Sequence, residues 1–357
     1  MAQGSQTLRI SIFRLFLLLM ALSSPSEGGW RWGILGLGKI ADDFATALTR
    51  TSVASAGGRL LACACRDEAR SRAFGTRFGL EQSRCYGSYD TLAQDPDVDI
   101  VYIASTHFLH RDHVLLCLQA GKHVVCEKAI ALNARQAEDM YACAKREGKL
   151  LLEANWTRFL PAIRRVRDLI RTGELGEVRL VTADFGKVMN RQDARRWLWE
   201  AEHGGGALLH MGMYPVTLAL LASQDQHEPA VQAIGQLSEG ETGVDQNVAV
   251  GLRWPGGVAS LGYSWVADTP EECVIVCSKG RVRIHPPAHC SDTLTIKRFG
   301  ATDGTRHAEG SEEVEHFPLP AVLAREDGEK LFHFGNSEGL AYEVEAVHKA
   351  LSDGLTE

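Results

Sequence analysis

The sequence lacks two features that would each assign it to a particular class of protein. It has no excess of positive charge, because 38 Lys and Arg stand against 45 Asp and Glu, for a formal net charge of −7, and the basic residues are scattered. Nucleic-acid-binding proteins normally show a basic patch, so no nucleic acid partner is expected. The leucine-rich run at residues 15–22 is also too short for a bilayer span, which needs roughly 20 residues, so no stable membrane span is expected.

The sequence also lacks the paired cysteines of a typical metal site. Nine cysteines are present, an odd number, and no CxxC pair occurs. Most lie inside apolar runs, such as Cys63 and Cys65 in one and Cys273 and Cys277 in another. Because cysteine packs as a small hydrophobic residue, this pattern predicts free buried thiols and favours an intracellular, cytoplasmic protein over a secreted disulfide scaffold.

Residues 1–29 differ in composition from the rest of the chain. They carry no acid before Glu27, basic residues at Arg9 and Arg14, and Ser-Ser-Pro-Ser after the leucine-rich run. This pattern fits a signal peptide, a mitochondrial leader or an extension that targets nothing. The localisation therefore stays open, and these residues are excluded from the fold.

The folded part is predicted to begin with a strand at residues 30–35 and a glycine-rich turn. The pattern G-x-G-x-x-(G/A) is formed by Gly36, Leu37, Gly38, Lys39, Ile40 and Ala41. In such a turn Gly36 permits the tight bend, Gly38 lets the backbone approach a pyrophosphate, and Ala41 allows close packing of the next helix. Because a strand precedes the turn and a helix comes after it, the pattern indicates a dinucleotide-binding site.

The tip of the next strand bears on the choice between NADP and NAD. An acid at this position is typical of NAD sites, and arginine is typical of NADP sites. The tip residue is Arg66, and Arg70 lies one helical turn beyond, so both guanidinium groups can face one phosphate. We therefore expect NADP, with NAD as the alternative because Asp67 is also present.

Strand and helix patterns alternate up to about residue 150. They predict an α/β fold with a doubly wound parallel sheet, and a dinucleotide-binding domain over residues 30–150. His107, His110 and His113 lie in this region, but their i, i+3, i+6 spacing does not bring all three to one helix face. No metal site is expected there.

After Gly148 the pattern changes to long strands joined by tight, glycine-containing turns. It predicts a second α/β domain over residues 151–357 with an open, mostly antiparallel sheet. Three glycines in this part, residues 204–206, precede His210 and Tyr214. The i, i+4 spacing of these two residues predicts that they share one face of a helix.

Five segments in this order resemble the Gfo/Idh/MocA oxidoreductase family: GILGLGKIA, DIVYIASTHFLH, AGKHVVCEK, EANWTRFLPA and GGGALLHMGMYPV. The similarity runs from Trp30 nearly to the end of the sequence. EANWTRFLPA and Tyr214 look most like the dihydrodiol dehydrogenase branch. The resemblance implies a Rossmann domain, a second domain whose open sheet mediates a homodimer, and NADP-dependent oxidation of a trans-dihydrodiol or of an aldose such as D-xylose.

The resemblance also implies roles for individual residues. Lys128 and Tyr214 match the catalytic positions, with Lys128 holding the substrate hydroxyl and lowering the pKa of the tyrosine that takes its proton. Glu127 is expected to position the lysine or contact the nicotinamide ribose. Further cofactor contacts are expected from Thr106, His107 and His110, and substrate contacts from Trp156 and Arg158.

Three departures from the family pattern affect this interpretation. Ala129 stands after the lysine where proline is usual, which predicts a less restrained Lys128. His210 replaces the usual aspartate, and a protonated histidine repels an ammonium group, so His210→Asp is expected to raise oxidation. The sequence also ends before the final helix of the branch, which predicts exposed apolar surface on the nucleotide-binding domain. The alternative is an NADP-binding protein with impaired catalysis that acts as a sensor or scaffold.

Overall fold

The structure is a computed structural model, and it describes residues 29–51, 57–190, 196–224, 228–238, 243–322 and 331–355. The prediction of a leader over residues 1–29 lies outside these ranges except for Gly29. Among the described residues no single helix is long and apolar enough to cross a membrane. The segments Ala201–Met211 and Met213–Ala222, which meet at 50°, reach that length and apolarity only together.

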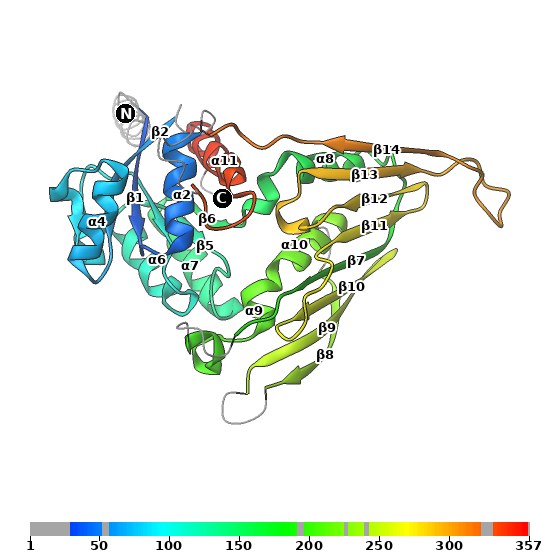
Figure 1. The fold of residues 1–357 in the computed structure, drawn as a ribbon, viewed down its shortest axis with the longest axis horizontal. Coiled ribbons are helices and arrows are strands. Elements are labelled where there is room, and N and C mark those ends of the chain that lie inside the picture. The colour runs from blue at the N-terminus through cyan, green and yellow to red at the C-terminus, as the bar shows by residue number, and fades with distance from the viewer. Residues whose placement is uncertain are drawn as a thin grey trace, which may run out of the picture.

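The first sheet has six parallel strands in the order β3-β2-β1-β4-β5-β6 (Figure 1). They are β1 (Trp30–Leu35), β2 (Gly58–Ala64), β3 (Cys85–Tyr86), β4 (Ile100–Ile103), β5 (His123–Glu127) and β6 (Leu151–Ala154). Every residue of β4 and β5 is buried, because both faces of a parallel sheet are covered. The sequence of such strands is therefore a continuous apolar run. The predicted doubly wound parallel sheet is confirmed.

Helices cover both faces of this sheet. They are α2 (Lys39–Arg50), α4 (Glu68–Phe78), α5 (Tyr89–Gln94), α6 (His110–Gln119), α7 (Ala134–Glu147) and α11 (Leu340–Ser352). Helices α2 and α11 share one apolar core with Trp32 and Tyr102, and α6 and α7 contribute Val114 and Met140 to the other. Both β6 and α11 thus pack with the first sheet, although they fall within the range 151–357 that the sequence assigns to the second domain.

The second sheet has eight strands in the order β14-β13-β12-β11-β7-β10-β9-β8. They are β7 (Val178–Gly186), β8 (Ala230–Leu237), β9 (Asp245–Trp254), β10 (Gly257–Ser264), β11 (Cys273–Cys277), β12 (Gly280–Ile284), β13 (Thr293–Arg298) and β14 (Ser311–His316). Only the pair β7 and β10 is parallel, so the predicted mostly antiparallel sheet is also confirmed. Helices α8 (Pro161–Arg171), α9 (Ala207–Met211) and α10 (Met213–Ala222) lie against one of its faces (Figure 1).

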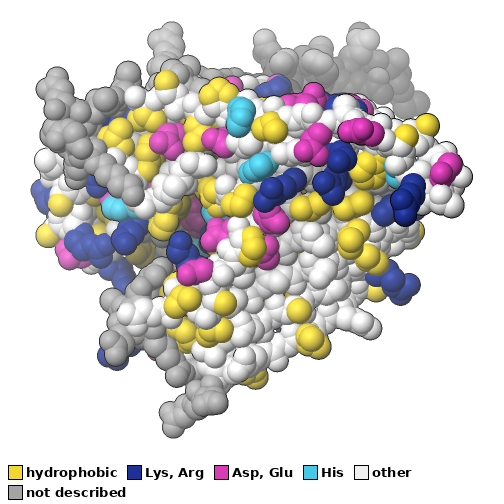
Figure 2. All heavy atoms as spheres, turned by 45° about the vertical axis from the view of Figure 1, so that its right-hand side comes forward, with side chains coloured by type: hydrophobic (Ala, Val, Ile, Leu, Met, Phe, Trp, Pro, Cys, Tyr) yellow, Lys and Arg dark blue, Asp and Glu magenta, His cyan; other side chains and the backbone are white. Residues whose placement is uncertain are grey.

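The other face of the second sheet is open. Buried and exposed residues alternate along β10 and β12, as expected for strands with one covered face. The strand register aligns Val258, Leu180 and Val276 across β10, β7 and β11, and Val258 and Leu180 are both exposed. With this side of the molecule turned forward, hydrophobic side chains lie scattered between polar and charged ones (Figure 2).

The nine cysteines are all buried and free. Burial raises the pKa of those thiols whose values shift, for example that of Cys117 to about 12. They therefore stay protonated and pack as small apolar groups, in the manner that the sequence pattern predicts.

Candidate functional site

The glycine-rich turn between β1 and α2 is shaped to approach a phosphate group. Gly36 has a φ of +88°, and a Cβ there would lie 2.8 Å from the backbone nitrogen of Ser105, so a side chain does not fit. Around Gly38 a Cβ would meet no atom within 4 Å, which leaves the turn open. Gly38 is also the N-cap of α2 and offers no side chain to cap it, so backbone N–H groups of the first helical turn remain to bind an anion. The turn fits a dinucleotide pyrophosphate.

The residues at the tip of β2 lie beside this turn. The guanidinium of Arg70 donates to the backbone carbonyl of Leu37 over 3.0 Å, and both Arg66 and Arg70 are exposed. The carboxylate of Asp67 accepts hydrogen bonds from the backbone nitrogens of Ala69 and Arg70 at 3.0 and 3.2 Å and so caps α4. The acid that would favour NAD is thus engaged in a helix cap.

The histidines after β4 bind protein carbonyls. His107, in the short helix η3 (His107–Leu109), has its Nε2 2.9 and 3.0 Å from the carbonyl oxygens of His203 and Gly204. The two ring nitrogens of His110 each lie 2.9 Å from a carbonyl oxygen, those of Ala129 and Ser105. Burial lowers the pKa of His110 to about 4, so its neutral ring donates to one of these carbonyls at a time. Both histidines thus connect the segment after β4 to other parts of the backbone.

Thr106 precedes η3 as its N-cap residue and makes no side-chain capping bond. The third histidine of this segment, His113, has its Nδ1 2.9 Å from the hydroxyl of Ser105. The three histidines therefore contact different atoms of the protein, although His110 and His113 both contact Ser105. Within the described ranges, no group of three or more His, Cys, Asp or Glu is arranged to hold a metal ion.

Lys128 comes directly after β5 and reaches across to the second domain. Its ammonium donates to the backbone carbonyl of His210 over 3.0 Å and lies 5.1 Å from the centre of the Tyr214 ring, a cation–π contact. Burial lowers the pKa of Lys128, and the charges of Glu127 and Glu153 oppose that shift. The lysine sits within the molecule, aimed at the tyrosine that the sequence pairs with it.

Ala129, where proline is expected from the resemblance, is held by its neighbours. Its carbonyl contacts His110, and the next backbone nitrogen, of Ile130, donates to Glu153 over 3.0 Å. The Lys128–Ala129 peptide bond is cis. The contacts of Ala129 and Ile130 restrain the backbone at the substituted position.

Glu127 faces the interior. Its Oε1 accepts from the hydroxyl of Tyr102 at 2.5 Å, and its Oε2 accepts from the backbone nitrogen of Lys128 at 3.2 Å. Burial raises the pKa of Glu127, while Lys128 and the Tyr102 hydrogen bond act against the rise. Of its two predicted roles, this geometry fits the positioning of the lysine.

Tyr214 is buried at the start of α10. Its hydroxyl accepts a hydrogen bond from the indole of Trp156 at 3.3 Å; Trp156 lies in the short helix η4 (Trp156–Phe159). Burial, and then the charge of Glu127, raise the pKa of Tyr214 above its usual range. The resemblance implies that Lys128 lowers this pKa, and the loss of water around the buried phenol acts in the opposite direction.

His210 and Tyr214 do not lie in one continuous helix. His210 belongs to α9 and Tyr214 to α10, and the helical segments on the two sides of Gly212 are bent by 50°. The His210 ring lies edge-on to Trp197 and Trp265, at 6.1 and 5.9 Å between ring centres. The contact with Lys128 comes from its backbone carbonyl, which any residue at this position supplies.

Two aromatic residues beside Tyr214 were not identified from the sequence. The ring of His289, in the short helix η7 (Ala288–Cys290), stacks on Phe185 with 4.7 Å between ring centres and lies 4.9 Å from the ring of Tyr214. Phe185 belongs to β7, and its ring centre lies 5.7 Å from that of Tyr214. No spacing pattern connects residues 185, 214 and 289, since only the folding of the second sheet brings them together.

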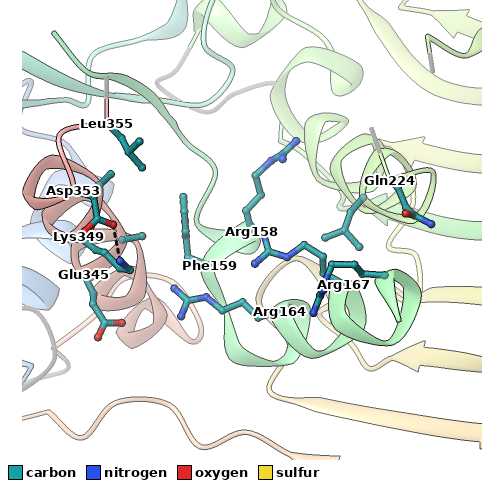
Figure 3. Close-up of a pocket in the computed structure, with 13 residues that line it drawn as sticks. Arg158, Phe159, Arg164, Arg167, Gln224, Glu345, Lys349, Asp353 and Leu355 are labelled. Atoms are coloured by element: carbon teal, nitrogen blue, oxygen red, sulfur yellow. Dashed lines mark hydrogen bonds and ion pairs between the residues drawn. The ribbon is translucent and has the colours of Figure 1, made fainter. Parts of the chain in front are cut away.

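Arg158 lines a different part of the surface. It borders a groove of about 990 Å³ between α8 and α11, which Arg164 and Arg167 face from α8 and Lys349 from α11 (Figure 3). Of the two predicted substrate residues, the structure thus brings Trp156 to the Lys128–Tyr214 pair and places Arg158 in this separate groove.

Comparison with known protein families gives two matches that together cover most of the chain. Residues 30–154 match the oxidoreductase family with an NAD-binding Rossmann fold, Gfo/Idh/MocA, and residues 163–283 match the Gfo/Idh/MocA C-terminal domain. Among curated proteins, the chain is 35% identical to trans-1,2-dihydrobenzene-1,2-diol dehydrogenase of Bos taurus over 329 residues. It is 35% identical to that of Homo sapiens over 328 residues. Both alignments cover 92% of this chain and 90% of the relative.

Solved structures share the fold. Levoglucosan dehydrogenase in complex with NADH and levoglucosan superposes with a TM-score of 0.76 at 18% identity, over 92% of this chain and 91% of the other. A 3-ketoreductase from Actinomadura kijaniata in complex with NADP superposes with a TM-score of 0.70 at 24% identity, over 91% and 90%. At these identities the likeness establishes the architecture alone.

Proposed function

The chain belongs to the Gfo/Idh/MocA family of NAD(P)-dependent oxidoreductases, and from this premise we propose that it oxidises a cyclic trans-dihydrodiol, or an aldose such as D-xylose, with NADP as the cofactor. The observation that carries the proposal is the contact between the Lys128 ammonium and the Tyr214 ring, beside the end of β5. Ligands of open α/β sheets bind at the carboxyl ends of the strands. The bovine and human relatives are named as dihydrodiol dehydrogenases, which supports the diol as substrate.

The directions of the two pKa shifts suggest which residue, Lys128 or Tyr214, takes the proton of the substrate. Oxidation of an alcohol requires loss of the hydroxyl proton as hydride leaves the same carbon. Because burial lowers the pKa of Lys128 and raises that of Tyr214, the amine is the member of the pair that releases its proton at the lower pH. In this proposal Lys128 takes the hydroxyl proton, and the Tyr214 hydroxyl orients the substrate oxygen.

The remaining residues hold this pair and the cofactor. Glu127 positions Lys128 through its backbone nitrogen, and the carbonyl of His210 fixes the ammonium. The turn at Gly36 and Gly38 holds the pyrophosphate, and the nicotinamide supplies the hydride acceptor when NADP is bound. Arg66 and Arg70 are the groups proposed to bind the ribose 2′-phosphate, because Asp67 is engaged in the cap of α4.

We also propose that the open face of the second sheet forms a homodimer. The exposed strip of Val258 and Leu180 crosses adjacent strands of this face, and an exposed apolar strip of this kind is stabilised by a matching surface. Charged residues of the same face, such as Arg281 on β12, give polar borders to the strip.

The test is an assay of the purified protein with NADP or NAD and a panel of cyclic diols and pentoses, followed at the absorbance of the reduced cofactor. We expect turnover of at least one diol or pentose, faster with NADP than with NAD. Because the amine must be deprotonated to act, kcat/KM should rise with pH to a plateau, through a pKa below the ordinary value of Lys. NADP binding without any turnover would instead support the sensor or scaffold alternative.

A further inference from the structure

His289 has no part in the chemistry proposed so far, yet it lies next to the reactive pair. Its ring is stacked on Phe185 and is 4.9 Å from the ring of Tyr214, on the side where Trp156 approaches at 6.3 Å between ring centres. The backbone carbonyl of His289 accepts a hydrogen bond from the hydroxyl of Thr157 at 2.5 Å, which ties η7 to η4. The imidazole is thus fixed in place by residues from three separate segments.

The ring nitrogens of His289 make no hydrogen bond to the described residues. Its Nδ1 is buried and has no hydrogen-bond partner within the described part of the chain. Burial, followed by the charges of Lys128 and Lys187, lowers the pKa of His289 to about 3, so the ring is neutral at neutral pH. A buried polar group without a hydrogen-bond partner destabilises the folded state, so an apolar residue would be more stable here if this position only served packing.

The tautomer of this neutral ring depends on its surroundings. A carboxylate oxygen of Glu271 lies 3.9 Å from Nδ1, too far for a hydrogen bond but close enough to favour the proton on that nitrogen. Nε2 then carries the lone pair. Since Nδ1 is buried while the side chain keeps 19% exposure, the accessible part of the ring lies away from Nδ1.

We propose that His289 is a specificity-determining residue that binds a second hydroxyl of the substrate, next to the hydroxyl oxidised at Lys128. The inference rests on the proposed function. The Lys128 ammonium and the His289 ring lie 5.1 and 4.9 Å from the centre of the Tyr214 ring, so both groups pack against the same side chain. In a vicinal diol or a sugar the neighbouring hydroxyl donates to Nε2, and the ring of Phe185 offers an apolar face to the carbon skeleton.

The test compares substrates with and without the second hydroxyl. The variant His289→Phe keeps an aromatic ring on Phe185 and removes both nitrogens. We expect kcat/KM for a trans-cyclohexenediol to fall about tenfold, mostly through KM, as for the loss of one hydrogen bond to a neutral group. For the matching cyclohexenol, which has only one hydroxyl, the variant and the wild type should agree within about twofold, because neither forms the bond.

Two further variants separate recognition from structure. His289→Gln retains a hydrogen-bonding group at this position and should recover part of the preference for the diol. His307→Phe makes the same replacement at an exposed histidine between β13 and β14 and should behave as wild type. A His289→Phe variant that loses both substrates equally, or neither, overturns the inference even if the enzyme is active.

A binding measurement keeps the inference testable without turnover. Quenching of tryptophan fluorescence, to which Trp156 contributes, reports diol binding in the presence of NADP. Tighter binding of the diol by wild type than by His289→Phe, without turnover, would support His289 and refute the dehydrogenase. Equal binding by the two proteins would refute the role of His289 alone.

Discussion

A single lysine carries most of the proposed chemistry, and the protein holds it from two directions. The carbonyl of His210 fixes the ammonium, and the face of Tyr214 lies beneath it. Both contacts come from the second domain, while the lysine itself stands at the end of a strand of the first. The catalytic geometry therefore depends on how closely the two domains approach each other.

Lys128→Met should abolish turnover while leaving NADP affinity nearly unchanged. The replacement keeps an unbranched side chain, one atom shorter, and removes the group that takes the proton, so we expect a loss of at least about 100-fold in kcat. The pyrophosphate site at Gly36 and Gly38 is unaffected. Steady-state rates and a fluorescence titration with NADPH measure the two effects, and full activity of the variant would exclude a catalytic role for Lys128.

His210→Ala should keep most of the activity, within about threefold of wild type, because a hydrogen bond to a backbone carbonyl survives a change of side chain. The family pattern predicts a different outcome, in which His210→Asp raises oxidation by restoring an acid near the ammonium. Oxidation rates of His210→Ala and His210→Asp, measured over a range of pH, decide between the two expectations. A large loss in His210→Ala would show that the imidazole itself takes part.

At the scale of elements, the glycine-rich turn and the start of α4 form one unit, because Arg70 of α4 binds the carbonyl of Leu37 in the turn. Both parts were predictable from the sequence. The strand Trp30–Leu35 has the predicted bounds, since an apolar run before a glycine turn is a local signal. The cap that Asp67 gives to α4 is not predicted, because the acid is interpreted from the sequence as a possible ribose contact.

Replacing both Arg66 and Arg70 with Ala should erase the preference for NADP over NAD. Charge-assisted hydrogen bonds to a phosphate contribute about 1.5–3 kcal/mol each, and NAD offers no 2′-phosphate to bind. Dissociation constants for NADPH and NADH measure the change. Arg72→Ala is the control, because Arg72 is exposed on the same helix and pairs with Glu68. Equal affinity of the wild-type protein for NADPH and NADH would contradict the assignment of Arg66 and Arg70 to the 2′-phosphate.

The free energy of unfolding should fall as the pH rises, because of the buried carboxyl group of Glu343 on α11. The side chain is fully buried, and neither carboxyl oxygen has a hydrogen-bond partner within the described ranges. Burial, and then the charges of Glu127 and Glu153, raise its pKa well above the usual 4.5. The folded state thus keeps a proton that the unfolded chain releases, so stability is lost as the pH rises from the unfolded pKa towards the folded one, by about 1.4 kcal/mol per pH unit.

Glu343→Gln removes this titration. The free energy of unfolding of the variant should increase relative to wild type as the pH rises above the usual carboxyl pKa of 4.5, measured by urea unfolding at each pH. Glu345→Gln, at a more accessible acid on the same helix, should behave as wild type throughout. Parallel pH dependence of Glu343→Gln and wild type would mean that Glu343 is ionised in the folded protein.

Other elements were less accessible to sequence reasoning. The break between α9 and α10 depends on Gly212 inside an otherwise helical pattern, and a glycine there is compatible with a continuous helix as well. The position of His289 beside Tyr214 depends on the β12–β13 connection meeting α10, a contact between residues far apart in sequence. Local patterns carry no information about such contacts.

At the scale of the whole molecule, the open face of the second sheet is the surface on which the proposed dimer depends. Leu180→Glu combined with Val258→Glu places two charges on neighbouring strands of this face, and we expect the dimer to dissociate. Sedimentation or light scattering measures the mass. Val188→Glu alters an exposed valine outside the strand and serves as the control. A wild-type monomer would contradict the proposal directly.

The return of α11 to the first sheet has a consequence for how the protein is made. Ala341, Val344 and Val347 fill the same core as Trp32 and Phe44, which stand some three hundred positions earlier in the chain. During translation the nucleotide-binding half emerges from the ribosome first, yet one side of its core stays exposed until residues 340–352 have been synthesised. The first half to appear is therefore among the last to be completed, and nascent chains are expected to need protection from aggregation over most of their synthesis.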